Sequence, residues 1–259
     1  MSSSATARLV FVTPFTVSGS PDLPDVPLSE GDKGSEVQRL QSVLIRLKYL
    51  GGRVDGDFGP KTKAALARFQ RDWRLTPDGT YGPETCIALQ KALTPVHKPA
   101  VVSRPSPNFE SRNGVDIDAI VLHHTGTNRV SVDLATLRSR GSRRVSSHYL
   151  IAPTGTVYQL VPDYRAAWHA GVSSLHGVTQ PSVNSRSIGI EITNDGTGLT
   201  PFTEAQYHAL ERLVPYLART YKVPKENIVG HRDVAPGRKT DPADNFEWVR
   251  VRRAVDAVL

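Results

Sequence analysis

A short unit of sequence occurs twice in the first third of the chain and restricts how that region can fold. The first copy runs from Asp55 to Thr62 (DGDFGPKT) and the second from Asp78 to Thr85 (DGTYGPET), 23 residues later. In each copy Asp-Gly turns the chain, the aromatic residue fills a core, and Gly-Pro places a proline near the first helical turn. The repeat is too short for a solenoid, so we expect two turn-plus-helix units inside one small domain.

A further helix is expected before this repeat. Between Glu36 and Tyr49 the apolar residues recur at every third or fourth position, which is the spacing of one buried helical stripe. The segments DGDFGPKTKAALARFQ and PDGTYGPETCIALQ resemble the three-helix peptidoglycan-binding module of cell-wall hydrolases. The resemblance implies a small all-α domain over residues 29–93 with peptidoglycan as its partner. The alternative is that the repeated turns serve folding alone.

Two segments with little periodicity flank this domain. Residues 1–28 are rich in Ser, Pro and Asp and are expected to be a loosely ordered leader. They lack the features of a signal peptide, so we expect cytoplasmic accumulation and action on the cell wall or periplasm after the membrane is breached. Residues 94–108 contain four prolines and are expected to form a semi-rigid linker.

In residues 109–259, strand and helix patterns alternate. This order predicts an α/β (α+β) domain with a mixed central sheet flanked by helices. The strands are expected at 117–123, 187–193 and 227–231, with a hairpin formed by 148–152 and 157–161, and the helices at 203–221 and 248–259. No stretch approaches the roughly 20 apolar residues of a membrane helix, so we expect no membrane insertion.

Three residues that can bind a metal follow or end predicted strands. They are His123, His231 and Asp241. The single cysteine, Cys86, excludes multi-cysteine zinc sites, so a zinc ion here would need histidines and carboxylates. Three protein ligands leave a fourth position open for catalysis, which points to metal-assisted hydrolysis of an amide or ester. Taken singly, however, each histidine is more often a surface or core residue than a ligand.

Five segments, in order, connect these residues to a known family. VLHHTGT, SSHYLIAPTGTVYQLV, AWHAG, NSRSIGIEI and VGHRDVAPGRKTDP together resemble the zinc-dependent type-2 N-acetylmuramoyl-L-alanine amidases, related in fold to the peptidoglycan recognition proteins. The resemblance implies Zn²⁺ bound by His123, His231 and Asp241. Neighbouring strand residues point to opposite faces, so His123 and His124 cannot both bind one metal. The sequence alone would allow either, and the resemblance selects His123. Some relatives carry a cysteine where this chain has Asp241, and a carboxylate still suits zinc.

The resemblance also implies two catalytic residues. Glu191 in SIGIEI would be the general base that accepts a proton from water and passes it to the leaving nitrogen. Its alternative is a solvent-facing Glu on an edge strand. Lys239, two residues before Asp241, would stabilise the oxyanion, and without the resemblance it would be interpreted as a surface lysine.

Four further residues are candidates for substrate binding. Trp168 and His169 in AWHAG are expected to line the groove for sugar or peptide, although they could equally belong to the core. Asn184 and Arg186 are plausible donors to the carbonyls and carboxylates of an acidic stem peptide.

The sequence therefore predicts a two-domain, monomeric peptidoglycan hydrolase that cleaves the amide between N-acetylmuramic acid and L-alanine. A bacteriolytic phage endolysin is the main expectation. The alternatives are a bacterial amidase of cell-wall turnover or recycling, or a non-catalytic muropeptide-recognition protein. The net charge of +7 suits an anionic envelope, and no motif supports nucleic-acid binding.

Overall fold

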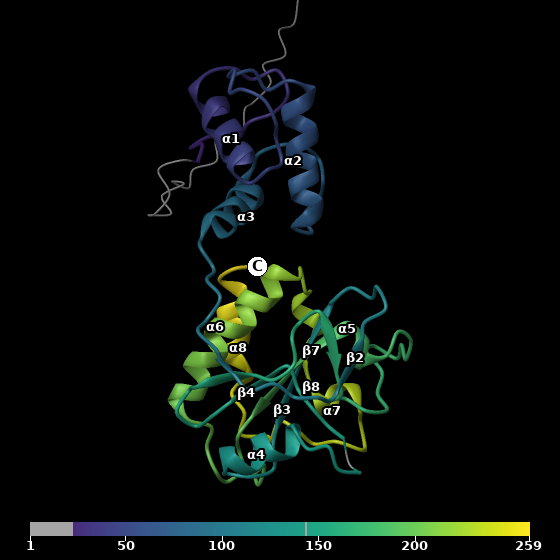
Figure 1. Cartoon of the computed structure of the whole chain (residues 1–259). Coiled ribbons are helices and arrows are strands. Elements are labelled where there is room, and N and C mark those ends of the chain that lie inside the picture. The colour runs from purple at the N-terminus through teal and green to yellow at the C-terminus, as the bar shows by residue number, and fades with distance from the viewer. Residues whose placement is uncertain (1–22, 143) are drawn as a thin grey trace, which may run out of the picture. The chain divides into compact units, whose positions relative to one another are not determined.

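The structure, a computed structural model, describes residues 23–142 and 144–259 and divides into two compact units that part between Thr94 and Pro95 (Figure 1). Each unit has its own hydrophobic core. Within the described residues, no helix combines the length and the hydropathy needed to span a bilayer.

The first unit is the three-helix domain that the apolar stripe and the repeat together predict. Its helices are α1 (Ser35–Arg46), α2 (Pro60–Asp72) and α3 (Pro83–Leu93), and the last two begin at the prolines of the two repeat copies. The repeat aromatics Phe58 and Tyr81 are fully enclosed in the core. The turn chemistry and the apolar stripe therefore place all three helices.

A buried glutamine from the preceding helix holds the first repeat turn together. The amide nitrogen of Gln41 donates to Asp55 Oδ1 at 2.7 Å and to Thr62 Oγ1 at 3.1 Å, while its amide oxygen accepts the Gly56 N–H at 2.9 Å. Gly56 takes a positive φ of 74°, which few other residues adopt. Every polar atom of the Gln41 amide thus has a partner within the turn.

The second turn repeats this arrangement around Gln70. Its amide nitrogen donates to Asp78 Oδ1 at 2.8 Å and to Thr85 Oγ1 at 3.0 Å, and its oxygen accepts the Gly79 N–H at 2.8 Å. We call these two networks the glutamine hubs. The internal repeat therefore includes a residue on the helix before each turn, which the Asp-Gly-aromatic-Gly-Pro pattern alone does not reveal.

The described ends of the predicted leader and linker are more ordered than expected. Residues 1–22 of the predicted leader lie outside the described residues, but Leu23 and Leu28 are buried in the first core, and Leu28 exchanges backbone hydrogen bonds with Tyr81. In the predicted linker, strand β1 (Val102–Ser103) joins the sheet of the second unit, and Asn108 is buried. The leader is ordered here because its two leucines are buried in the core of the first unit. The linker is ordered because β1 pairs with the sheet and Asn108 is buried.

The second unit contains the predicted mixed sheet. Its six strands lie in the order β1-β5-β4-β7-β3-β8, and all neighbouring pairs are parallel except β4 and β5, which form the predicted hairpin. The bounds of the remaining strands are β3 (Ala119–His124), β4 (Tyr149–Ile151), β5 (Val157–Gln159), β7 (Ser187–Ile192) and β8 (Ile228–Gly230). A separate two-stranded sheet pairs β2 (Phe109–Ser111) with β6 (Arg165–Ala167).

Helices cover both faces of the six-stranded sheet (Figure 1). The long helix α6 (Glu204–Thr220) and the last helix α8 (Trp248–Asp256) pack on one face, where they enclose the main core with the isoleucines of β7. Short helices α5 (Val183–Arg186) and α7 (His231–Val234) lie on the other face, with α4 (Val130–Leu137) near β4. The sequence did not predict α4, α5, α7, β2 or β6, because each of these short segments shows too few repeats of a periodic pattern.

Strand register sets the position of the candidate site. Strands β3 and β7 are parallel, with Ala119 opposite Ser187, so His123 is paired with Glu191. Because side chains alternate along a strand, both project from the face opposite the isoleucine core. The two parallel strands thereby bring a histidine and a carboxylate to one end of the sheet.

Candidate metal centre

Three potential metal ligands from separate segments converge at this end of the sheet. His123 stands near the end of β3, His231 is the first residue of α7 directly after β8, and Asp241 lies in the following loop. The three are buried, and the Nδ1 atoms of both histidines and Asp241 Oδ2 lie 3.0 Å from one another. The structure thus brings together the three residues that the sequence singled out, whereas neighbouring His124 is not part of the cluster.

The chemistry of these donors fits a metal ion. His231 Nε2 lies 3.0 Å from the carbonyl oxygen of Ala170, which can only accept, so in the neutral ring the proton is on Nε2 and Nδ1 carries a lone pair. Burial lowers the pKa of His123 to about 4, so its imidazole is neutral at neutral pH. A tetrahedral zinc ion with bonds of about 2.0–2.1 Å holds its ligand atoms roughly 3.3 Å apart, close to the spacing here. The residues present therefore fit a zinc ion.

Glu191 lies beside this cluster and is unusual for a strand residue. Its Oε2 is buried and has no hydrogen-bond partner among the described residues. Burial, and then the carboxylates of Asp241 and Asp133, raise the pKa of Glu191 well above its usual range, while Lys239 acts in the opposite direction. An unpaired buried carboxyl is costly, which is typical of a group kept for chemistry.

A pocket of about 410 Å³ opens over the cluster. The three ligand candidates and Glu191 contribute to its wall, together with Trp168 and Lys239. Its size is in the range of a small-molecule or peptide-binding cleft. The predicted base and the predicted oxyanion-stabilising lysine therefore face the same cavity as the metal ligands.

The four predicted substrate-binding residues are placed differently from one another. Trp168 lines the pocket, and His169 contributes to the wall but is mostly buried, with its ring nitrogens against His123 and Ser187. Asn184 and Arg186 do not line the pocket. The Asn184 amide oxygen accepts backbone N–H groups, and Arg186 forms a bidentate ion pair with Asp118. A substrate contact by Asn184 or Arg186 stays a prediction that these contacts do not favour.

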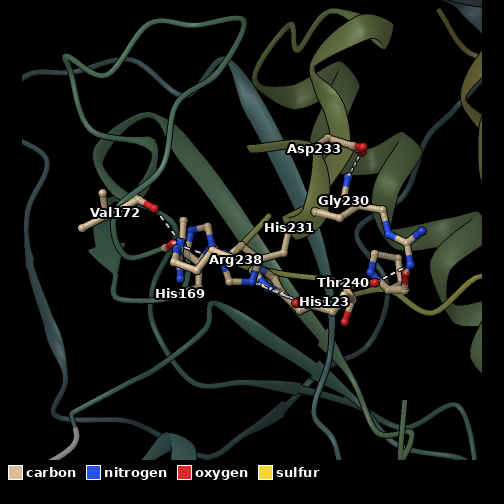
Figure 2. A network of polar contacts seen from close by, with 12 residues as sticks. His123, His169, Val172, Gly230, His231, Asp233, Arg238 and Thr240 are labelled. Carbon is tan, nitrogen blue, oxygen red and sulfur yellow. Dashed lines mark hydrogen bonds and ion pairs between the residues drawn. The ribbon is translucent and has the colours of Figure 1, made fainter. Parts of the chain in front are cut away.

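The structure adds residues that the sequence did not single out. Arg238 lines the pocket, and its guanidinium donates to the carbonyl oxygens of Ala170 and Val172 at 2.7 and 2.6 Å, which ties two loops together (Figure 2). Asp133 also lines the pocket and accepts hydrogen bonds from Thr127 and Thr193 hydroxyls, each at 2.6 Å. Nothing in the local sequence marks Asp133, because its partners are distant in the chain. Arg238 directly precedes Lys239 in the GRKTDP segment, so the sequence could have indicated it as a further residue of the site.

Comparison with protein families gives a match to each unit. The family described as N-acetylmuramoyl-L-alanine amidase matches residues 113–244, about half of the chain. The family described as a putative peptidoglycan binding domain matches residues 33–89. These ranges cover the pocket in the second unit and the two glutamine hubs in the first.

Individual relatives agree with the match to the second unit. The 1,6-anhydro-N-acetylmuramyl-L-alanine amidase AmpD of Citrobacter freundii is 44% identical over 112 residues, which are 43% of this chain and 58% of that protein. The N-acetylmuramoyl-L-alanine amidase AmiD of Escherichia coli strain K12 is 39% identical over 146 residues, 51% of each chain. A crystal structure of an AmpD selenomethionine derivative is 32% identical, with a TM-score of 0.55, and the match covers 60% of this chain and 94% of that one. The chain thus spans between half and three fifths of the length of these two curated relatives.

Proposed function

We propose, on the premise that the chain belongs to the N-acetylmuramoyl-L-alanine amidase family, that it hydrolyses the amide bond between N-acetylmuramic acid and L-alanine in peptidoglycan. The observation that carries the proposal is the convergence of two histidine nitrogens and one carboxylate oxygen within 3.0 Å of one another, beside an unpaired glutamate in a pocket. Binding alone requires no such site, which argues against a purely recognition role.

In this proposal His123, His231 and Asp241 hold a zinc ion. When bound, zinc supplies Lewis acidity, which polarises a carbonyl and makes water a stronger acid. The pocket places substrate over the ligands, and Trp168 on its wall offers an aromatic surface to the sugar or the peptide.

Glu191 is the proposed proton carrier. It lies opposite His123 in the strand register and lines the pocket, and its buried Oε2 has no competing partner among the described residues. Because burial raises its pKa, the carboxyl is a better proton acceptor than an exposed glutamate. It accepts the proton of the attacking water and donates it to the amide nitrogen that leaves.

Lys239 is the proposed source of positive charge for the developing oxyanion. It lines the same pocket and lies two residues before Asp241, on the loop that carries the third ligand. A fixed cation at this position stabilises negative charge that forms on the amide oxygen in the transition state.

For the biological setting, we propose bacterial cell-wall turnover or recycling, the alternative to the phage endolysin expected from sequence. Support comes from the relatives described above, which are bacterial amidases. The match of residues 33–89 to a peptidoglycan-binding family favours polymeric wall over small soluble muropeptides as the substrate. A binding module tethered to an enzyme raises the local concentration of its polymer.

Mass spectrometry of digested sacculi tests the reaction. The full chain should release peptides with free L-alanine N-termini and leave intact glycan strands. Exhaustive chelation should abolish this release, and Zn²⁺ should restore it. Cleavage at another bond, or full activity after chelation and metal analysis, would contradict the proposal.

The setting has its own test. Rates on intact sacculi and on a soluble anhydro-muropeptide should be compared at equal enzyme concentrations. Preference for sacculi supports a role in wall turnover, whereas strong preference for the soluble anhydro form would assign a recycling role. Rapid lysis of intact bacteria on external addition would instead support the endolysin assignment.

A further inference from the structure

Behind the three ligands lies a second layer of residues that the proposed chemistry does not use directly. Figure 2 shows His169, His123 and His231 together, and the His123 ring contacts the rings of both other histidines. We propose that His169 and the backbone carbonyl of Ala170 are positioning groups that hold both histidine ligands in the tautomer whose Nδ1 lone pair faces the metal. This inference rests on the proposed metal-dependent function and concerns how this chain builds the site.

The direction of the hydrogen bonds can be followed from a fixed end. The Ser187 hydroxyl donates to the backbone carbonyl of Val183, which can only accept. Since a hydroxyl has one hydrogen, its contact with His169 Nε2 at 3.1 Å requires Nε2–H to donate to Ser187. The neutral His169 ring then has a lone pair on Nδ1.

This lone pair determines the state of the first ligand. His169 Nδ1 lies 3.0 Å from His123 Nε2, so the His123 proton is on Nε2 and is donated to His169. The Nδ1 atom of His123 is therefore left with a lone pair, turned toward His231 and Asp241. A proton on Nδ1 instead would occupy the position that a metal needs.

The neighbouring residue does the same for the second ligand. The Ala170 carbonyl oxygen accepts the Nε2–H of His231 at 3.0 Å, which leaves the His231 Nδ1 lone pair free. Two adjacent residues thus fix both rings, and three acceptor atoms without a proton meet at one point. Such an arrangement is stable only with a cation between them, or with a proton drawn in.

Two other residues hold this segment in place. The Asn184 amide oxygen accepts the backbone N–H groups of His169 and Ala170 at 3.2 and 2.8 Å. Gly189 on β7 makes room for the His169 ring, because a side-chain carbon at this position would collide with it. Both nitrogens of His169 form hydrogen bonds, with His123 and Ser187, so neither is free to bind substrate. We therefore attribute its place in the pocket wall to its contact with His123.

The test compares two substitutions of similar shape at position 169 in the full chain. Asn places an amide oxygen near the position of Nδ1, so His169→Asn keeps an acceptor for His123, whereas His169→Leu removes it. Competition for Zn²⁺ against a chromophoric chelator should show affinity lowered about 10- to 100-fold in His169→Leu. His169→Asn should recover most of that loss. His208→Leu, which changes an exposed histidine on α6, is the control and should match wild type.

A spectroscopic measurement tests the tautomers directly and needs no variant. In metal-free full-length protein with ¹⁵N-labelled histidine, Nε2 of both His123 and His231 should carry a proton, whether or not a further proton is shared among the two Nδ1 atoms and Asp241. In His169→Leu, His123 should populate the Nδ1–H form while His231 remains unchanged. A wild-type His123 that is protonated on Nδ1 and not on Nε2 would overturn the proposal, as would zinc affinity in a folded His169→Leu protein equal to that of wild type.

These readouts separate this inference from the proposed reaction. Wild type that binds Zn²⁺ but cleaves no muramoyl-alanine bond would defeat the proposed function and leave the affinity comparison valid. Wild type that cleaves this bond, with affinity insensitive to residue 169, would defeat the positioning role alone.

Discussion

The two units each bury a polar network, and the networks differ in how completely their atoms are paired. In the first unit each glutamine hub uses one amide to join a turn, a glycine N–H and a threonine hydroxyl. In the second unit two lone pairs and a carboxylate face one another, and a nearby glutamate oxygen has no partner among the described residues.

This difference separates scaffold from site. A buried polar group that is fully paired stabilises one conformation, and its net contribution is modest. A buried group without a partner costs free energy and is retained where a ligand, an ion or a reaction uses it. The hubs are therefore structural, whereas the cluster around His123 and Glu191 is the part that the proposed chemistry uses.

The largest expected effect is a loss of turnover when the unpaired glutamate is replaced. Glu191→Gln keeps the shape of the side chain but removes the proton acceptor, so turnover of a soluble muropeptide should fall about 10²- to 10⁴-fold. Bound zinc and thermal stability should change little. Glu110→Gln, on the exposed strand β2, serves as the matched control and should leave turnover unchanged. Wild-type turnover in Glu191→Gln would remove Glu191 from the mechanism.

A second effect should appear in stability and should be confined to one unit. Because Zn²⁺ binds the folded second unit, it should stabilise that unit by about 4 kcal/mol at a free concentration 1,000 times the dissociation constant. The first unit offers no such cluster in its described residues, so its transition should not move. Calorimetry of the full chain with and without Zn²⁺ should show one shifted and one unshifted transition. Equal shifts of both would contradict the assignment of the metal to His123, His231 and Asp241.

Sequence patterns were sufficient for the long elements and for choosing the three residues that the structure brings together. The apolar stripe of α6, the β3 and β7 strands and the repeat turns all carry local signals, and the structure contains each of them. His123, His231 and Asp241 could be selected because five motifs occur in a fixed order, although they lie up to 118 residues apart.

The roles of neighbouring residues could not be predicted, because they depend on tertiary contacts. AWHAG places His169 beside Trp168 in sequence, yet Trp168 lines the pocket, whereas His169 is mostly buried with its ring against His123. Asn184 and Arg186 resemble substrate donors only until their backbone and Asp118 partners are known. A glycine within an apolar strand, Gly189, was the one local signal of the close approach by His169.

Acid should destabilise the second unit more than the first, by an amount between the other predicted effects. Burial lowers the pKa of His148 to about 3 from an ordinary value near 6.5. Below pH 6.5 His148 binds a proton in the unfolded chain but stays neutral in the folded unit. The free energy of unfolding of the second unit therefore falls as the pH drops from 6.5 toward 3. At pH 5 this histidine alone costs about 2 kcal/mol.

The first unit should resist the same acidification. Residues 1–94 contain no histidine. The pKa of Asp78 is lowered, chiefly by its hydrogen bond with the Thr80 N–H, so its stabilising contribution is lost only as the pH falls below about 3.8. Amide signals followed by NMR in metal-free protein should disappear from the second unit first. The expected difference in acid stability would be contradicted if the amide signals of both units disappeared at the same pH, or if those of the first unit disappeared at a higher pH.

The smallest effect concerns a glutamine hub. Gln41→Ala leaves the Gly56 N–H and the Thr62 hydroxyl without their shared partner, which should destabilise the first unit by about 1–3 kcal/mol. Gln38→Ala, on an exposed position of the same helix, should cost less than about 0.5 kcal/mol. Zinc affinity and turnover of a soluble muropeptide should stay at wild-type values, because both belong to the second unit. A loss of zinc affinity in Gln41→Ala would show that the hubs do more than hold the repeat turns.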